Sequence, residues 1–241
     1  MSGFSNQVVV VTGASSGVGR AIALALAEKG ATVALVGRDL KTLEAVAASA
    51  PDRMKCYVAD LVDDAALPDL KKRITADFGG IEGLVHSAGV FAMGRLETAP
   101  LADFDLQYRS NVRAPFALTQ IFLPSLIERQ GQIVFINSTA GLSAGGGVSQ
   151  YAATKHALKA VADSLRQEVN SQGVRVLSVY LGRTATPMQQ AICKTEGKSY
   201  DPAYFIQPHD VAETLLHTLS LPRTAEIIDV TLRPMKKPPL A

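Results

Sequence analysis

The fold is decided by the stretch Val8-Val9-Val10-Val11-Thr12-Gly13-Ala14-Ser15-Ser16-Gly17-Val18-Gly19. Its first four residues form a continuous apolar run, as expected for a parallel strand that is buried on both faces. A glycine-rich turn follows at once. Residues 20–29 then carry apolar side chains at helical spacing and end before Gly30, a residue type that often stops a helix. A strand, a glycine turn and a helix in this order predict the first unit of an open α/β sheet.

The alternation of strand and helix continues through the rest of the chain. Apolar runs predict strands at residues 8–11, 32–36, 54–58, 83–85, 133–136, 174–180 and 226–231. Helical spacing predicts helices at residues 20–29, 39–50, 63–78, 101–129, 150–172 and 208–219, the fourth of them bent near Pro115. The pattern indicates a single-domain α/β fold: a Rossmann-like, doubly wound parallel sheet of about seven strands with helices on both faces.

Nothing in the composition divides residues 1–241, so we expect one domain. Residues 182–207 show no clear periodicity, and this stretch is too long for an ordinary connection between a strand and a helix. Long segments of this kind are often functional lids. We therefore expect residues 182–207 to be irregular and to form the substrate loop.

The overall composition excludes several classes of protein. A net charge of +2 is too small for a nucleic-acid footprint. The chain has no run of about 18 apolar residues, and residues 1–6 lack the basic start of a signal peptide. We therefore expect a cytoplasmic protein with neither nucleic-acid nor membrane partners. The two cysteines form no CxxC pair and the histidines lie far apart, so no metal site is expected; these residues are Cys56, Cys193, His86, His156, His209 and His217.

The glycine turn lies where open α/β sheets bind the pyrophosphate of a dinucleotide, at the N-terminus of the first helix. Glycines let the backbone approach the phosphates, and free amides point at their charge. The spacing Gly-x3-Gly-x-Gly differs from the commoner Gly-x-Gly-x2-Gly, and glycines also make tight turns that bind nothing. The position directly after the first buried strand favours binding. The predicted contacts are Gly13, Ser15, Ser16, Gly17, Val18 and Gly19.

The end of the second strand distinguishes between the two nicotinamide dinucleotides. A carboxylate there favours NAD through the ribose 2′-hydroxyl, whereas a cation favours NADP through the 2′-phosphate. The sequence reads Arg38-Asp39, and Asp39 is well placed to cap the following helix. Arg38 therefore favours NADP(H), with NAD(H) as the less favoured alternative, although Arg38 alone is also compatible with a surface charge.

Tyr151 and Lys155 share a helix face, because four residues are close to one helical turn. A free tyrosine has a pKa near about 10, and a neighbouring ammonium favours the phenolate. The pair can therefore work as an acid and base, although Tyr-x3-Lys alone is common on helix surfaces. Ser138 follows the strand at 133–136 and lies at the sheet edge where ligands bind.

The chain resembles the short-chain dehydrogenase/reductase family over nearly its whole length. The resemblance rests on an ordered set of motifs, each weak by itself. They are Thr12-Gly13-x3-Gly17-x-Gly19, Asp60-Leu61, Ala88-Gly89, Asn111, Ser138, Tyr151-x3-Lys155 and the segment from Gly182 through Thr184 to Thr186.

The resemblance implies a role for each motif. Tyr151 would exchange a proton with the substrate oxygen, Ser138 would bind the same oxygen, and Lys155 would hold the nicotinamide ribose and lower the pKa of Tyr151. Asn111 would position a water that links Lys155 to solvent. The remaining contacts of the cofactor would come from Asp60 at the adenine, from Leu61, Ala88, Gly89, Gly182 and Thr184, and from Thr186 at the nicotinamide end.

Two positions depart from the family pattern. His86-Ser87 stands where the family often has two asparagines, and we expect His86 to be a hydrogen-bonded structural residue. Leu181 precedes Gly182 where the family usually has proline, so the start of the substrate loop is expected to be less rigid.

These features predict hydride transfer between NADP(H) and a carbonyl or alcohol substrate. Apolar residues around the expected pocket favour a ketone or aldehyde that is mainly apolar; they include Val90, Phe91, residues 140–143, Met188, Ile192, Tyr200, Tyr204 and Phe205. The alternative is a regulatory protein that binds NADP(H) without catalysis, and an epimerase or dehydratase is disfavoured by the length of the chain. The helices at 101–129 and 150–172 are expected to pair in a homodimer or homotetramer.

Overall fold

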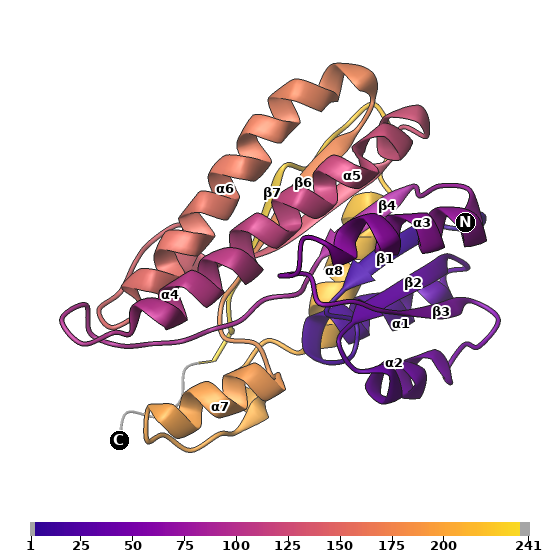
Figure 1. The fold of residues 1–241 in the computed structure, drawn as a ribbon. Coiled ribbons are helices and arrows are strands. Elements are labelled where there is room, and N and C mark those ends of the chain that lie inside the picture. The colour runs from indigo at the N-terminus through magenta and orange to yellow at the C-terminus, as the bar shows by residue number, and fades with distance from the viewer. Residues whose placement is uncertain (1–2, 237–241) are drawn as a thin grey trace.

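Seven parallel strands lie side by side in one sheet, in the order β3-β2-β1-β4-β5-β6-β7 (Figure 1). The structure is a computed structural model that describes residues 3–236. The strands are β1 (Val8–Thr12), β2 (Thr32–Gly37), β3 (Met54–Val58), β4 (Gly83–His86), β5 (Gln132–Ser138), β6 (Arg175–Leu181) and β7 (Asp229–Leu232). The predicted doubly wound sheet is confirmed.

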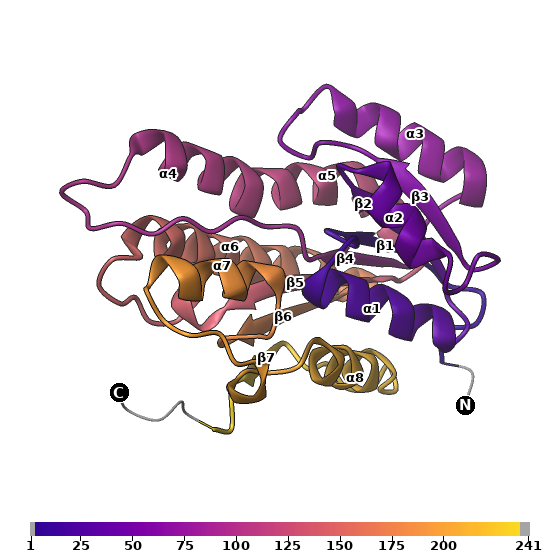
Figure 2. The same cartoon turned by 90° about the horizontal axis from the view of Figure 1, so that it is seen from below.

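Helices cover both faces of this sheet (Figure 2). The first face carries α1 (Gly17–Glu28), α2 (Leu40–Ala47) and α8 (Pro208–Leu219), whose buried side chains share one core cluster. The second face carries α3 (Ala66–Phe78), α5 (Ala114–Glu128) and α6 (Ser149–Val169), which share the other. Along β1, Val9 and Val11 enter the first cluster and Val10 enters the second. This alternation explains why the strand is apolar at every position.

The helix predicted over residues 101–129 is continuous to Glu128 and contains one wider turn. It consists of α4 (Leu101–Tyr108), a π-helical turn (Arg109–Arg113) and α5. The π-helical turn therefore precedes Pro115, which has no backbone amide to donate to the residues one turn before it. Asn111 and Val112 within the wide turn are buried. Turns of this kind are frequent at functional sites.

The prediction that residues 182–207 are irregular is wrong, because this segment contains α7 (Pro187–Thr195) and a short 3₁₀ turn (Pro202–Tyr204). The segment stands apart from the main layers in Figure 1. Its two ends meet in an isolated bridge, in which the Ala185 amide donates to the Ile206 carbonyl at 2.8 Å. The sequence did contain a start signal for α7: Thr186 caps it by accepting from the amide of Gln189 at 3.1 Å, and Pro187 occupies its first position.

Other boundaries differ by a few residues. The glycine turn itself begins α1, and α2 ends at Ala47 rather than at residue 50. The expected cap of α2 is confirmed, because the Asp39 carboxylate accepts from the Thr42 amide at 2.8 Å. Turns occupy residues 61–62 and 64–65 before α3, and β7 begins only at Asp229.

No helix within residues 3–236 combines the length and apolar character needed to cross a membrane. Within the same range, no group of three or more His, Cys, Asp or Glu side chains is arranged to hold a metal ion.

Candidate functional site

The glycine turn after β1 is packed closely against two segments that are distant in sequence. Gly13 and Gly17 have φ angles of +64° and +54°, a region that favours glycine. A Cβ on Gly13 would lie 2.9 Å from the Cα of Ala88, and one on Gly17 would lie 3.0 Å from the Thr186 Cγ2 atom. Three of the predicted cofactor segments therefore meet at this turn.

The N-terminus of α1 can accept a phosphate. The first amides of a helix have no partner within it, and Ser16 makes no capping bond with its side chain. Ser15, Ser16 and Gly17 also line an open groove of about 600 Å³. Free amides at a helix N-terminus, approached through side-chain-free glycines, fit the pyrophosphate of a dinucleotide.

Thr12 fixes the segment that follows β4, a contact that the sequence did not reveal. Its hydroxyl donates to the Val85 carbonyl and accepts from the amides of Ser87 and Ala88, at 3.0 and 3.1 Å. The expected contact segment Ala88-Gly89 is thereby held beside the glycine turn. Ser87 contributes its backbone to this arrangement, and its Oγ atom lies near Gly19.

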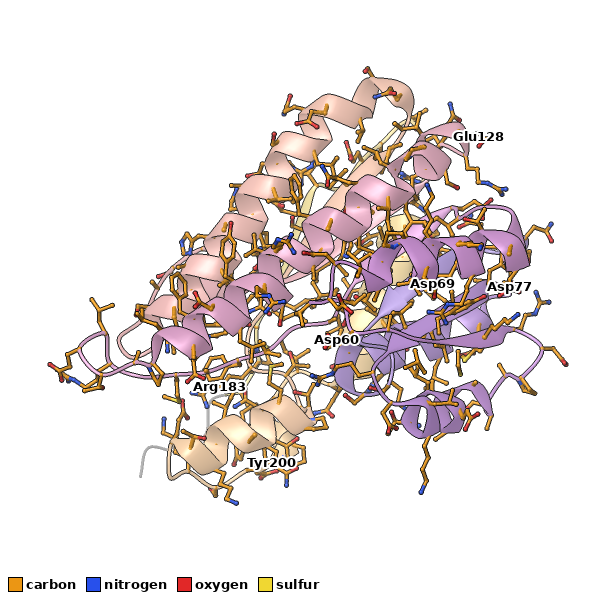
Figure 3. All side chains as sticks on the ribbon, viewed as in Figure 1. Asp60, Asp69, Asp77, Glu128, Arg183 and Tyr200 are labelled. Carbon is orange, nitrogen blue, oxygen red and sulfur yellow. The ribbon has the colours of Figure 1, made fainter. Side chains whose placement is uncertain are left out.

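The predicted adenine-side residues follow the ends of β2 and β3. These strands are neighbours, with Gly37 opposite Val58, so Arg38 and Asp60 emerge at the same edge of the sheet. Arg38 is exposed, and no ion pair or hydrogen bond of its side chain occurs within residues 3–236. Asp60 is also exposed (Figure 3), and its carboxylate accepts from the Val62 amide at 3.2 Å, beside the half-buried Leu61.

Ser138 and Tyr151 come together from the end of β5 and the first turn of α6. Burial raises the pKa of Tyr151 to about 12, and a hydrogen bond with Ser138 acts in the opposite direction. The Tyr151 hydroxyl therefore keeps its proton at neutral pH. The Tyr151 ring also contacts Phe91 in an edge-to-face arrangement, with ring centroids 4.8 Å apart and planes at 69°.

The expected lowering of the Tyr151 pKa by Lys155 is not found in this structure. The Lys155 ammonium donates to the Ile136 carbonyl at 3.1 Å and lies 5.8 Å from the centroid of the Tyr151 ring. Burial lowers the pKa of Lys155 itself to about 8, which reduces its positive charge near that pH. Desolvation of the phenol outweighs the hydrogen bond with Ser138, so the pKa of Tyr151 is raised rather than lowered.

Asn137 is a site residue that sequence reasoning missed. Its side chain accepts from the Ser138 amide at 2.8 Å and donates to the Lys155 carbonyl at 3.1 Å. At Gly141, a Cβ would lie 2.8 Å from both the Asn137 Oδ1 atom and the Lys155 carbonyl oxygen. Asn137 thus ties β5 to α6 and fixes Ser138 relative to Tyr151. Its position one residue before Ser138 was the available signal.

Asn111 lies in the π-helical turn with its side chain fully engaged. Its Oδ1 accepts from the Val90 amide at 2.9 Å, while its Nδ2 donates to the Val90 carbonyl at 2.9 Å and to the Thr154 hydroxyl at 3.2 Å. Both amide hydrogens are used, so neither is available to a water. The expected water-positioning role of Asn111 stays a prediction, and any such water needs the backbone or the remaining oxygen lone pair.

Gly182 and Thr184 lie at the root of the α7 segment rather than in an open loop. The Gly182 amide donates to the Leu232 carbonyl at 2.8 Å, and the Thr184 hydroxyl donates to the Gly182 carbonyl at 3.1 Å. Leu181 is buried at the end of β6. These bonds tie the residue that follows Leu181 to the neighbouring strand β7.

Arg183 pairs with a carboxylate of its own segment. Its guanidinium donates to both Glu196 oxygens, at 2.9 and 2.5 Å, and Lys198 lies 3.2 Å from the same carboxylate. The Arg183 guanidinium lowers the pKa of Glu196, and the pKa of Arg183 is raised in return. Figure 3 shows Arg183 beside α7, with Tyr200 on the opposite side of that helix.

The residues expected to line a substrate pocket behave in different ways. Phe91 contacts Tyr151. Gly145 to Gly147, which precede α6 and are not in that set, have open space around them. In the α7 segment, Tyr200 and Phe205 stack on each other at 5.4 Å, and Met188 is exposed. Phe91 is therefore the aromatic residue placed directly at the candidate catalytic group.

A dinucleotide fold with a serine, a tyrosine and a lysine at the carboxyl edge of its sheet defines the class of protein. The sequence profile described as short chain dehydrogenase matches residues 7–197. The chain belongs to this family and is an oxidoreductase of it.

Known proteins resemble the chain along nearly its whole length. An uncharacterised oxidoreductase of Staphylococcus epidermidis is 30% identical over 98% of this chain and 100% of its own. A metagenomic short-chain oxidoreductase, solved in complex with NADP, has a TM-score of 0.84 at 30% identity and covers 97% of this chain and 100% of its own. An alcohol dehydrogenase of the archaeon Thermococcus sibiricus, complexed with 5-hydroxy-NADP, has a TM-score of 0.88 at 25% identity, covering 98% and 99%.

Proposed function

We propose that this protein transfers a hydride between NADP(H) and a carbonyl or alcohol carbon, and that its physiological substrate is a mainly apolar ketone or aldehyde. The observation that carries the proposal is the placement of Tyr151, half-buried beside Ser138 with Lys155 one helical turn away. NADP(H), when bound, supplies the hydride for reduction or accepts it in oxidation.

Tyr151 is the proposed acid and base. A phenol with a pKa raised to about 12 is protonated at neutral pH, which is the state that reduction of a carbonyl requires. Its proton passes to the carbonyl oxygen as that oxygen gains negative charge. The Ser138 hydroxyl donates a hydrogen bond to the same oxygen and stabilises its charge. In alcohol oxidation the two groups act in reverse.

Lys155 and Asn137 prepare the site. The Lys155 ammonium is proposed to hold the ribose hydroxyls of the nicotinamide nucleotide. Asn137 holds β5 and α6 together, so that Ser138 and Tyr151 keep one separation during turnover. Holding reacting groups in a fixed geometry lowers the activation barrier and accounts for a large part of enzymatic rate enhancement.

NADP(H) is the proposed cofactor because of Arg38. Its guanidinium is exposed at the end of β2, and the adjacent carboxylate of Asp39 is occupied by the cap of α2. A cation, and no free carboxylate, is thus presented where the ribose 2′-substituent is expected. Two of the matched structures contain NADP or 5-hydroxy-NADP, which supports this proposal.

Homo-oligomer formation through the helices α4, α5 and α6 is proposed as well. Large apolar side chains are exposed on two of these helices: Leu101, Leu106 and Tyr108 on α4, and Phe116 on α5. Sedimentation that shows only a monomer at micromolar concentration would reject the homodimer or homotetramer.

The second candidate function is an NADP(H)-binding regulator without catalysis. One experiment distinguishes it from the enzyme: NADPH oxidation is measured against ketones, aldehydes, quinones and acyl thioesters with the wild type and with Tyr151→Phe. The proposal expects turnover by the wild type, a loss in kcat of at least about 10²-fold in the variant, and NADPH binding within about threefold, because the lost hydroxyl acts mainly on substrate. Tight NADPH binding without any turnover favours the regulator.

A further inference from the structure

Two side chains of the helix that contains the π-turn hold the segment after β4. Asn111 binds both backbone groups of Val90, each at 2.9 Å, and Gln107 accepts from the amide of Ala92 at 3.0 Å. Gln107 and Asn111 are four residues apart and therefore project from neighbouring turns of one helix face. The backbone is thus fixed on each side of Phe91.

Phe91, between the two fixed residues, packs against the ring of Tyr151. The contact is edge-on, with centroids 4.8 Å apart, which is a favourable geometry for two aromatic rings. The helix holds the backbone of the two residues that flank Phe91, and the Phe91 side chain contacts Tyr151. Any movement of the Ala92 backbone therefore changes the face that Phe91 presents beside the phenol.

Gln107 occupies a buried position where its side chain carries a free-energy cost on folding. It is only 1% exposed, and its Nε2 group has no hydrogen-bond partner within residues 3–236. Burial of an unpaired amide donor opposes folding, and a leucine of similar volume would avoid this penalty. The acceptor bond from Ala92 is the one interaction that requires the carboxamide at this position.

A second tether lies farther along the same segment, where the Gly94 amide donates to the Gly147 carbonyl at 2.8 Å. Gly147 has a φ of +77° and belongs to the open glycine stretch before α6. That stretch has no neighbouring atoms within 4 Å of any added Cβ, so it offers little resistance to movement. Gln107 is therefore the firm anchor on the far side of Phe91.

We infer that Gln107 is a positioning residue that sets substrate selectivity by holding Phe91 against Tyr151. Phe91 is the wall that limits the carbonyl substituent on that side of the phenol, and Gln107 fixes the wall through Ala92. The inference concerns which carbonyl compounds are accepted and thus rests on the proposed function.

The geometric part is tested without turnover. Hydrogen–deuterium exchange of the peptide around residues 88–95 is measured in the wild type, in Gln107→Leu and in Gln107→Glu, which retains an acceptor oxygen. Gln107→Leu should speed exchange of this peptide about tenfold or more, since the Ala92 amide loses its acceptor. Gln107→Glu should restore slow exchange. Gln132→Leu is the matched control. Gln132 is another buried glutamine, and it donates to the Leu219 carbonyl at the amino end of β5, away from Phe91.

The functional part uses the ratio of kcat/KM for a bulky and a small ketone. Gln107→Leu should raise this ratio about tenfold in favour of the bulky ketone, because Phe91 can then move aside and admit the larger group. Phe91→Ala should raise it at least as far. In the Phe91→Ala background, Gln107→Leu should then have no further effect, because it acts through Phe91.

The outcomes separate the two proposals. If the wild type turns over no carbonyl compound, the proposed function fails, and the exchange experiment still decides whether Gln107 holds the segment. Unchanged exchange in Gln107→Leu overturns the inference. So do additive effects of Gln107→Leu and Phe91→Ala on the selectivity ratio, or a loss of kcat in Gln107→Leu that is equal for both ketones.

Discussion

His86 donates the hydrogen bond that it shares with Thr119. The His86 Nε2 and Thr119 Oγ1 atoms are 2.8 Å apart. The Thr119 hydroxyl donates its hydrogen to the Pro115 carbonyl at 2.8 Å, so it can only accept from His86. The proton of the neutral imidazole must therefore lie on Nε2. The ring also stacks on Phe135, with centroids 4.9 Å apart. This position, unusual for the family, is a buried link between β4 and α5.

This link predicts a loss of stability in acid. Burial lowers the pKa of His86 to about 3, compared with about 6.5 in the unfolded chain. The unfolded state therefore binds the proton first, and the stability contributed by neutral His86 is complete above pH about 6.5 and is lost as the pH falls toward 3. The melting temperature of the wild type should fall more steeply between pH 6.5 and 4 than that of His86→Gln. Parallel curves for the two proteins would show that His86 titrates normally.

Arg38 is expected to determine the choice of cofactor. Arg38→Glu should weaken NADPH binding about 10- to 100-fold, since it replaces a charge-assisted hydrogen bond with repulsion. NADH binding should change much less. Arg53→Glu is the control, because Arg53 precedes β3 and therefore lies at the amino ends of the strands, away from Arg38. Titration of nucleotide fluorescence measures the affinities of the wild type and both variants for NADPH and for NADH. Equal losses for NADPH and NADH would place Arg38 away from the 2′-phosphate.

Loss of the Ser138 hydroxyl is predicted to have two effects. Ser138→Ala should lower kcat for carbonyl reduction about 10²- to 10³-fold, because one donor to the developing oxyanion is missing. It should also move the rise of alcohol oxidation to higher pH, since the hydrogen bond with Ser138 lowers the pKa of Tyr151. Profiles of rate against pH in both directions report the two effects. Ser164→Ala, on the exposed part of α6, should retain the wild-type profile.

The pair of Arg183 and Glu196 is predicted to restrain α7. Glu196→Gln should accelerate proteolysis within residues 187–205 severalfold, because it removes the charge that both Arg183 and Lys198 share. The melting temperature should hardly change, since partly exposed ion pairs contribute only about 0–1 kcal/mol. High salt should reduce the difference between the proteins. The exposed Glu213 provides the control Glu213→Gln; equal proteolysis of the two variants would argue against a restraint by Glu196.

Local sequence patterns predicted the parts of the fold that local physics determines. The four valines of β1 reach both core clusters, so a uniformly apolar run is sufficient to identify a buried strand. Asp39 caps α2 through the Thr42 amide three residues away. The doubly wound order follows from repetition of such units. Ser138 and Tyr151 were found in the same way, from their positions at a strand end and a helix start.

Contacts between distant segments escaped prediction. Thr12 meets Ser87 and Ala88 across about a third of the chain, and no periodicity in the sequence marks it. The π-helical turn was missed because one extra residue per turn barely disturbs the apolar spacing around Asn111. The pKa of Tyr151 was predicted in the wrong direction, since the extent of its burial depends on Phe91 and on how α6 packs.

The bridge between Thr184 and Ile206 has an evolutionary consequence. The polypeptide leaves the domain and returns to it at almost the same point, so the residues between form a module whose ends do not depend on its length. Insertions or exchanges inside this module need not displace β6 or α8. Exchange of residues 187–205 between relatives is therefore expected to leave the central sheet unchanged.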